Sequence, residues 1–123
     1  MTSLDAVTAW VRRYRRAWES NEPDDIRDLF ADDAAYFTEP YSPPWVGREA
    51  IVAGWLAQRD EPGTTTFTWQ PVIITEELAV IEGRTHYPED REFRNLWVLR
   101  LDHTGQARQF TEWWMEVPRP PAP

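Results

Sequence analysis

Apolar and polar positions in the first twenty residues repeat with the period of an α-helix. Apolar side chains recur every three or four positions across residues 7–18, which places them on one helical face. Ser3 is suited to cap this helix, and Asn21-Glu22-Pro23 is suited to end it. Asp24 or Asp25 can then cap a second, shorter helix. The pattern therefore predicts two consecutive helices at the start of the chain.

Shorter segments of strand-like composition follow. A strand is expected at residues 34–38, an irregular proline-rich loop at 39–46, and a third helix after Gly47 that ends at 61–63. The C-terminal half predicts four more strands, at residues 64–75, 78–87, 93–102 and 107–117. Short turns between successive strands produce antiparallel hairpins, and helices grouped on one side define the α+β class. We expect a curved antiparallel sheet wrapped around the N-terminal helices, cone-shaped, with an internal pocket.

Length and charge bound the organisation of the chain. Its 123 residues correspond to one domain, expected at 1–117 and followed by a proline-rich mobile tail at 118–123. The N-terminus lacks the features of a signal peptide, and no apolar run is long enough to span a membrane. These features predict a cytoplasmic protein that does not associate with membranes. The net charge of −8 argues against nucleic-acid binding, which needs clustered positive charge.

Missing residue types exclude several kinds of chemistry. The chain has no cysteine, which excludes disulfides, thiolate catalysis and cysteine-ligated metal sites. All 13 basic residues are arginine, so no lysine can form a Schiff base. The two histidines, His86 and His103, are not spaced with acidic residues as metal ligands. We therefore expect no metal site.

Aromatic residues are more abundant than a core of this size requires. Eight Trp, four Tyr and five Phe indicate either the walls of a ligand pocket or an interface, or else a tryptophan-rich core. In the first interpretation a small organic molecule is the partner. The residues expected to bind it are Trp18, Trp55, Trp69, Asn95, Trp97, Phe110 and Trp114.

The two-residue period of a strand assigns faces in the last two strands. Asn95 and Trp97 share one face of the strand at 93–102, and Phe110, Glu112 and Trp114 share one face of the last strand. Both faces of both strands are rather apolar. That suits a sheet covered by helices on its inner side and by a partner subunit on its outer side. We therefore expect a homodimer.

Three residues are candidates for catalysis. Glu112, if it faces inward among aromatics, should have a raised pKa suited to proton transfer; the alternative is a structural ion pair with an arginine. Tyr14 lies on the apolar face of the first helix, either as a proton donor in the pocket or as a core tyrosine. Glu39 follows the first strand, either at the pocket rim or as an exposed loop residue. Asn95 either orients a ligand carbonyl or bonds across the sheet.

The order of these segments resembles a known family. The segments at 14–34, 46–51 and 99–114 resemble the opening helices, third helix and closing hairpin of SnoaL-like proteins and ketosteroid isomerases. These proteins belong to the nuclear transport factor 2-like superfamily, with a cystatin-like fold. The resemblance implies a cone-shaped pocket, homodimers formed through the outer face of the sheet, and no required metal or organic cofactor. It does not imply one reaction, because the family includes cyclases, isomerases, epoxide hydrolases and dehydratases.

Transferring the isomerase residues one by one gives an incomplete set. The oxyanion-hole tyrosine falls on Tyr14, and the general-base position falls on Thr38 or, with a shift of one residue, on Glu39. The second acid falls on Trp97, which cannot supply that function, so steroid isomerisation is disfavoured. The Asp-Arg-Asp set of the epoxide hydrolases is also missing from the strand face that carries Asn95 and Trp97.

Three functions follow from the sequence. The first is a cofactor-independent cyclase, isomerase or dehydratase in which Glu112 moves a proton and Tyr14 or Asn95 stabilises an enolate-like oxygen. The second is a non-catalytic binder of a hydrophobic or aromatic molecule. The third is an interaction module that uses Trp113 and Met115 on the outer face. The sequence leaves open whether the protein is an enzyme.

Overall fold

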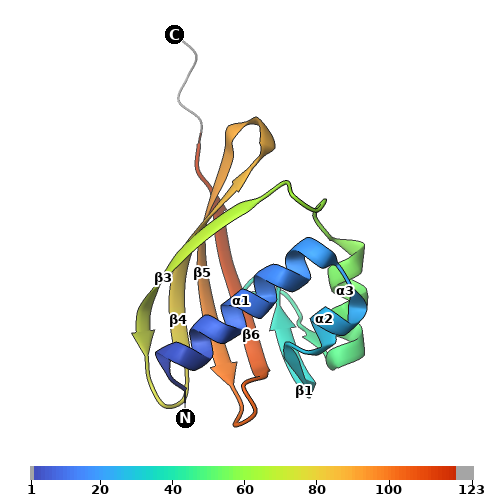
Figure 1. The fold of residues 1–123 in the computed structure, drawn as a ribbon, viewed down its shortest axis with the longest axis vertical. Coiled ribbons are helices and arrows are strands. Elements are labelled where there is room, and N and C mark those ends of the chain that lie inside the picture. Colours follow the sequence, from blue (N-terminus) through green and yellow to red (C-terminus); the bar gives the residue numbers. More distant parts are fainter. Residues whose placement is uncertain (1, 119–123) are drawn as a thin grey trace.

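The computed structural model describes residues 2–118 and consists of three α-helices and a six-stranded sheet (Figure 1). The predicted tail therefore lies outside the described residues, except for Pro118. The elements in chain order are α1 (Leu4–Ser20), α2 (Pro23–Arg27), β1 (Phe30–Phe37), β2 (Trp45–Val46), α3 (Arg48–Ala57), β3 (Thr66–Ile74), β4 (Ala79–Tyr87), the 3₁₀ turn η1 (Pro88–Asp90), β5 (Arg91–Leu101) and β6 (Ala107–Glu116).

The strands form one open sheet in the order β2-β1-β6-β5-β4-β3. The α+β class is confirmed, since the helices lie together on one side of this curved sheet (Figure 1). Strands β3 to β6 form the predicted antiparallel hairpins, but β1 pairs with β6 in parallel. The sheet is therefore mixed. The chain leaves β1 through α3, enters the sheet again at the far edge and returns by successive hairpins, which brings β6 alongside β1.

Local capping explains where the first helices begin and end. The Ser3 hydroxyl accepts a hydrogen bond from the Ala6 amide at 3.1 Å, and Asn21 takes the left-handed conformation that ends α1. The prediction that Asp24 or Asp25 caps the second helix is wrong. Pro23 is its first residue, because proline has the required φ and needs no hydrogen-bond partner there, and Glu22 is the N-cap.

Further boundaries differ from the prediction, and α3 ends at Ala57 instead of at 61–63. β1 begins at Phe30, four residues early, and the expected loop at 39–46 ends in strand β2. β2 pairs with β1 through Tyr36 and Trp45, whose rings stack with centroids 5.0 Å apart. Trp45 also lies directly over Gly54 of α3, where a Cβ would come within 2.3 Å of the indole. This close packing of aromatic side chains orders the end of the loop.

The core lies between α1 and the inner face of the sheet. From α1, Val7, Trp10, Val11, Tyr14 and Ala17 are buried. Trp10 donates a hydrogen bond to the Leu29 carbonyl at 3.0 Å and stacks on Phe110 of β6. α1 crosses the lower part of the sheet, while β4, β5 and β6 extend beyond its C-terminal end (Figure 1). The inner face of the sheet is therefore left partly uncovered at that end. No helix within residues 2–118 is both long enough and apolar enough to cross a membrane.

Candidate functional site

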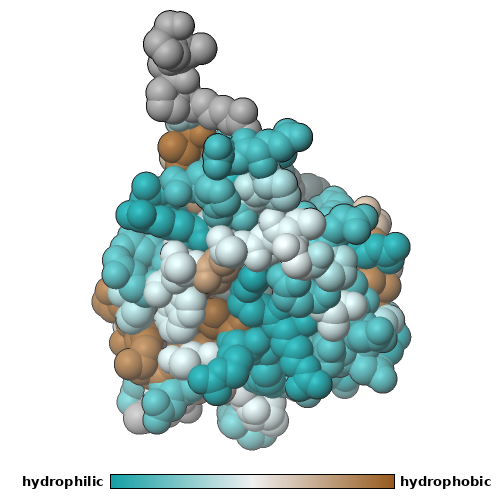
Figure 2. Space-filling view, turned by 45° about the horizontal axis from the view of Figure 1, so that its top comes forward, coloured by the Kyte–Doolittle hydropathy of each residue, from teal (hydrophilic) through white to brown (hydrophobic). Residues whose placement is uncertain are grey.

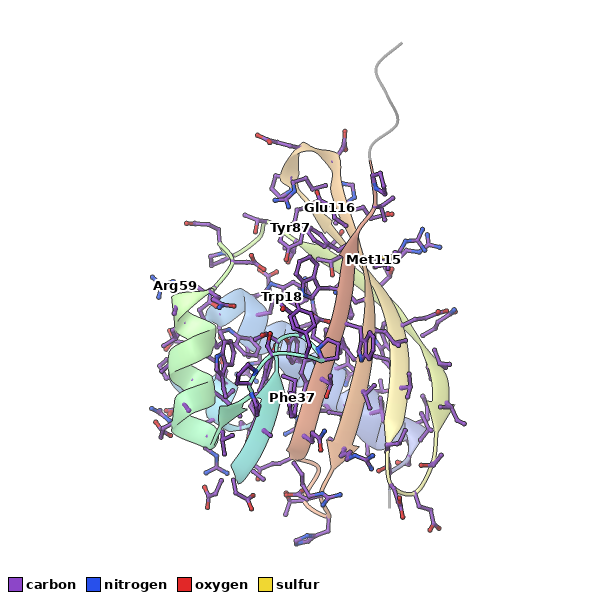
Figure 3. All side chains as sticks on the ribbon, turned by 180° about the vertical axis from the view of Figure 1, so that it is seen from behind. Trp18, Phe37, Arg59, Tyr87, Met115 and Glu116 are labelled. Carbon is purple, nitrogen blue, oxygen red and sulfur yellow. The ribbon has the colours of Figure 1, made fainter. Side chains whose placement is uncertain are left out.

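A cavity of about 480 Å³ opens where the helices leave the sheet uncovered. This volume is within the range of small-molecule sites. The residues that line it fall into two groups. The inner wall consists of buried residues, Tyr14, Tyr36, Trp55, Thr85 and Trp97, together with the partly exposed Asn95 and Glu112. The mouth includes Trp18, Glu39, Arg59, Asp60, Tyr87, Arg91 and Glu116, of which four are labelled around the opening in Figure 3.

Glu112 points into this cavity from β6. It lies directly opposite Trp97 of β5 in the sheet register, and both residues line the cavity on the inner face. Burial among apolar side chains raises the pKa of Glu112 to about 8, and the nearby N–H groups of Asn95 and Trp97 limit this rise. Within residues 2–118, Glu112 makes no ion pair. The alternative of a structural ion pair with an arginine therefore finds no support.

A hydrogen-bonded chain of three residues leads to the Glu112 carboxyl. The buried Thr85 hydroxyl donates to Asn95 Oδ1 at 2.8 Å, and Asn95 Nδ2 donates to Glu112 Oε2 at 3.4 Å. In this arrangement the Asn95 oxygen faces Thr85 and its amino group faces the carboxyl. Asn95 is thus both a cross-sheet partner and a lining residue of the cavity.

Two tyrosines form a second polar pair in the inner wall. The hydroxyls of Tyr14 and Tyr36 are 2.8 Å apart, and either one can be the donor. The hydroxyl that accepts this bond still has its own O–H, which can donate a hydrogen bond to a third group. Burial raises the pKa of both tyrosines, and the nearby Glu112 carboxylate raises both further. They are therefore neutral hydrogen-bond donors at physiological pH.

The mouth is organised around Asp60, in the segment between α3 and β3. Its carboxylate accepts hydrogen bonds from the Trp18 indole at 2.8 Å and from the Tyr87 hydroxyl at 3.1 Å. Its backbone carbonyl accepts a bond from Asn21, which in turn accepts one from the Trp55 indole. Asp60 therefore connects α1 with the end of β4 directly, and with α3 through Asn21.

Most of the predicted site residues lie at this cavity. Those that line it are Tyr14, Trp18, Glu39, Trp55, Asn95, Trp97, Glu112 and Trp114. Glu39 lies at the mouth, where its carboxylate accepts a hydrogen bond from the Ser42 hydroxyl at 3.0 Å within its own loop. That bond gives Glu39 a partner in the loop, and its predicted catalytic role remains a prediction.

Two predicted ligand-binding residues do not line the cavity. Phe110 is fully buried beneath the inner wall, where it packs against Trp10, Tyr14 and Trp97. Trp69 is partly buried against the core on the β3 side. The ring of Phe67 stacks on Trp97 with centroids 4.8 Å apart and covers Gly83, which closes the cavity toward β3. For these two residues the prediction of a pocket wall is wrong.

Sequence reasoning missed several lining residues. Tyr36 could have been found, because it alternates with Ala34 on the inner face of a predicted strand. Asp60, Tyr87 and Thr85 gave no comparable signal. Asp60 is in an irregular segment, and Tyr87 and Thr85 are in a strand whose inner face only the sheet register reveals.

The chemistry available at the site is that of neutral donors and one carboxyl group. Within residues 2–118 no group of three or more His, Asp or Glu side chains is arranged to hold a metal ion. A carboxyl group with a pKa near 8 can both give and accept a proton near neutral pH. The phenol pair can stabilise negative charge that develops on a ligand oxygen.

Comparisons with known proteins give a family model and a common fold. A model described as a SnoaL-like domain matches residues 11–117. An NTF-2 like protein of unknown function from Burkholderia xenovorans LB400 is similar in structure, with a TM-score of 0.72 at 15% identity, covering 95% of this chain and 88% of that one. A putative ketosteroid isomerase from Kribbella flavida DSM 17836 gives a TM-score of 0.70 at 18% identity, covering 97% and 84%. A sequence comparison with curated proteins gives no significant match. At such low identity the structural likeness establishes the fold alone.

Proposed function

Since the chain belongs to the SnoaL-like domain family, we propose that its cavity binds a small, flat organic molecule with a carbonyl group and that Glu112 moves a proton on it. The observation that carries this proposal is the position of the Glu112 carboxyl in an aromatic cavity. No cationic side chain among the described residues pairs with it there. The aromatic walls favour a conjugated or cyclic ligand body, because such rings bury large apolar areas against one another.

The proposed step is proton abstraction beside the carbonyl group. The ionised Glu112 accepts a proton from the carbon next to the carbonyl, and the electron pair of the broken C–H bond forms an enolate. The enolate oxygen accepts a hydrogen bond from the Tyr14–Tyr36 pair, whose free hydroxyl proton supplies the donor. Glu112 then returns the proton to another position of the ligand. Isomerisation, cyclisation and dehydration all can begin with this step.

The pKa of about 8 sets the expected pH dependence. Below that value most Glu112 is protonated and acts as an acid, and only about one tenth is ionised at pH 7. Proton abstraction by the carboxylate should therefore rise about tenfold per pH unit up to pH 8 and level off above it. A pH–rate profile measures this directly.

A deuterium-exchange assay tests the proposal without knowledge of the natural substrate. The probe is 2-tetralone, a flat bicyclic ketone whose acidic C1 protons exchange for deuterium in D₂O, followed by ¹H NMR. We expect the protein to accelerate exchange and Glu112→Gln to lower that acceleration by about 10²-fold or more. Glu82→Gln, an exposed carboxylate that borders a depression on the outer face of the sheet, serves as the matched control and should retain most of it.

The same assay separates catalysis from simple binding. Quenching of tryptophan fluorescence by the probe reports occupancy of the cavity. Quenching without accelerated exchange would refute the catalytic proposal and favour the second function, a non-catalytic binder. Exchange that is equally fast in Glu112→Gln would remove Glu112 from the mechanism.

We also propose that the outer face of the sheet pairs with a second copy of the chain. Trp113 and Met115 are 49% and 67% exposed on that face. Together with Leu96 they border a depression over β3 to β6. Exposed aromatic and methionine side chains of this kind are enriched in the cores of protein interfaces. The resulting homodimer is compatible with either function of the cavity.

A further inference from the structure

The indole N–H of Trp97 is an unsatisfied donor next to the proposed proton carrier. Trp97 is 1% exposed, and within residues 2–118 its Nε1 atom is buried with no hydrogen-bond partner. Leaving a buried donor unpaired is unfavourable, and native proteins rarely do so. Two other tryptophans of the cavity differ, because Trp18 donates to Asp60 and Trp55 donates to Asn21.

The position of Trp97 is fixed by aromatic packing. Its ring stacks on Phe67 with an interplanar angle of 14°. The ring centroids of Tyr14 and Phe110 lie 4.6 Å and 5.2 Å from that of Trp97, and Phe110 packs edge-on. A ring held on these sides cannot turn to seek another acceptor. A hydrogen bond to Nε1 therefore requires an acceptor side chain that moves toward the fixed indole ring.

Glu112 is the residue best placed to do so. It pairs with Trp97 across β5 and β6 on the same face, an arrangement that brings the Cβ atoms within about 4.5–5.5 Å of each other. Its side chain has flexible torsions, and its carboxyl already contacts Asn95 Nδ2 at the long distance of 3.4 Å. A small rotation would bring a carboxylate oxygen within reach of Nε1, and an ionised carboxylate gains most from a second donor.

We infer that Trp97 and Asn95 are positioning residues for Glu112, two donors that together hold its carboxylate once it has released its proton. The inference rests on the proposed function of this cavity, because it concerns the ionised state in which Glu112 acts as a base. Thr85 supports the pair by orienting the Asn95 amide. In the structure Asn95 Nδ2 is within hydrogen-bonding distance of the carboxyl, and Trp97 Nε1 is the second donor that the ionised carboxylate would take up.

Other ionisable groups near the carboxyl do not replace these donors. The nearby ionisable side chains are tyrosines: Tyr14 of α1, Tyr36 of β1 and Tyr87 of β4. Burial is the main cause that raises their pKa values, and the charge of Glu112 raises them further, so all three remain neutral. The charged groups of the cavity lie at its mouth and are Glu39, Arg59, Asp60, Arg91 and Glu116. Arg91 there pairs with Glu116 at 2.9 Å. The inner wall thus offers Glu112 only neutral donors.

The test is a titration of Glu112 in the intact protein. Glutamate labelled with ¹³C at the side-chain carboxyl is followed by NMR, and the Glu112 signal is the one that Glu112→Gln lacks. In Trp97→Phe, which removes the N–H and keeps an aromatic ring, we expect about tenfold tighter proton binding. The midpoint should therefore lie about one pH unit higher. Trp55→Phe is the matched control, since its N–H already bonds Asn21, and its midpoint should not move.

Several outcomes would overturn the inference. An unchanged midpoint in Trp97→Phe would do so, and so would an equal rise in Trp97→Phe and Trp55→Phe, which would indicate a general loosening of the aromatic packing. A wild-type midpoint near 4.5 would instead contradict the proposed acid–base function. In that case the difference between the two tryptophan variants would still test the donor pair.

A second measurement is made on the wild-type protein and does not depend on a shifted midpoint in a variant. In the wild-type protein the ¹H resonance of the Trp97 indole N–H should move downfield as Glu112 ionises, with the same midpoint as the ¹³C signal. Trp97→Phe identifies this resonance if it folds; otherwise its contact with Tyr14 and Phe110 identifies it through nuclear Overhauser effects. An indole resonance that stays constant through the Glu112 transition would show that Trp97 does not bind the carboxylate.

Discussion

The two faces of β5 and β6 carry similar residue types in different surroundings. On the inner face, Trp97 and Phe110 are buried against α1, with at most 1% of each exposed. On the outer face, Trp113 and Met115 of the same hairpin are 49% and 67% exposed. Figure 2 shows that hydrophilic residues predominate on the side from which it is drawn, with hydrophobic ones in scattered patches. Residue type alone therefore does not distinguish a core from a surface in this sheet.

The charged residues make the contrast sharper. On the outer face, Arg94 forms an ion pair with Glu92 at 3.4 Å, near solvent that screens both charges. On the inner face, Glu112 has no cationic partner among the described residues, and burial raises its pKa to about 8. The same strand pair thus holds an ordinary surface ion pair on one side and a chemically unusual carboxyl on the other. What differs is the polarity of the surroundings and not the residue type.

The largest expected difference between the faces is in stability. Phe110→Ala should lower the free energy of unfolding by about 3–5 kcal/mol, because it leaves a cavity under α1 that the neighbouring rings cannot fill. Trp113→Ala, measured in dilute solution where the outer face is uncovered, should change it by about 0.5 kcal/mol or less. Urea denaturation of both variants checks this. Losses of equal size would mean that the outer face contributes to folding as much as the core.

A smaller effect concerns the dependence of stability on pH. The pKa of Glu112 is raised from 4.5 to about 8 in the folded state. The stability it contributes is therefore complete below pH 4.5 and is lost as the pH rises toward 8, because the unfolded chain releases its proton first. Glu112→Gln cannot ionise. We expect it to match the wild type at pH 5 and to exceed it at pH 9 by about 2–4 kcal/mol, at roughly 1.4 kcal/mol per pKa unit with a discount for solvent in the cavity.

The control for this prediction lies on the other face. Glu82 is an exposed carboxylate that borders the outer depression. Urea denaturation of Glu82→Gln at both pH values should show no such gain over the wild type at pH 9. A gain in Glu82→Gln as large as that in Glu112→Gln would mean that net charge, and not burial, causes the effect.

The sequence was sufficient to predict which residues of each of the last two strands share a face. Alternation grouped Trp97 with Asn95 and Glu112 with Trp114 because a strand has a fixed period of two, and the register shows that Trp97 and Glu112 lie opposite each other. The periodicity of residues 7–18 likewise identified the buried face of α1. These successes depend on local geometry that a single element determines.

The predictions that failed depend on contacts between distant segments. Trp69 was expected in the pocket wall, but Phe67 covers Gly83 and fills the space between β3 and the cavity. The parallel pairing of β1 with β6 depends on the path of the whole chain. Asp60 is held at the mouth by hydrogen bonds from Trp18 of α1 and Tyr87 of β4. None of these contacts has a signal in the local sequence pattern.

The smallest expected effect on folding is also the one that tests the outer face as an interface. Trp113→Asp places a charge at the centre of the exposed apolar side chains, where a second copy would have to desolvate it. If the outer face forms the homodimer, sedimentation equilibrium should give the monomer mass for this variant and twice that mass for the wild type. The stability of the dilute monomer should change little, since Trp113 is half exposed there.

The matched control is a charge placed on an exposed apolar position away from the hairpin. Leu4, at the start of α1, is 53% exposed, and Leu4→Asp should leave the sedimentation mass of the wild type unchanged. A wild-type protein that sediments as a monomer would contradict the proposed homodimer, and a Trp113→Asp variant that stays dimeric would place the interface elsewhere. The cavity should bind 2-tetralone equally well in Trp113→Asp, because the substituted side chain lies on the opposite face of β6 from Glu112 and Trp114.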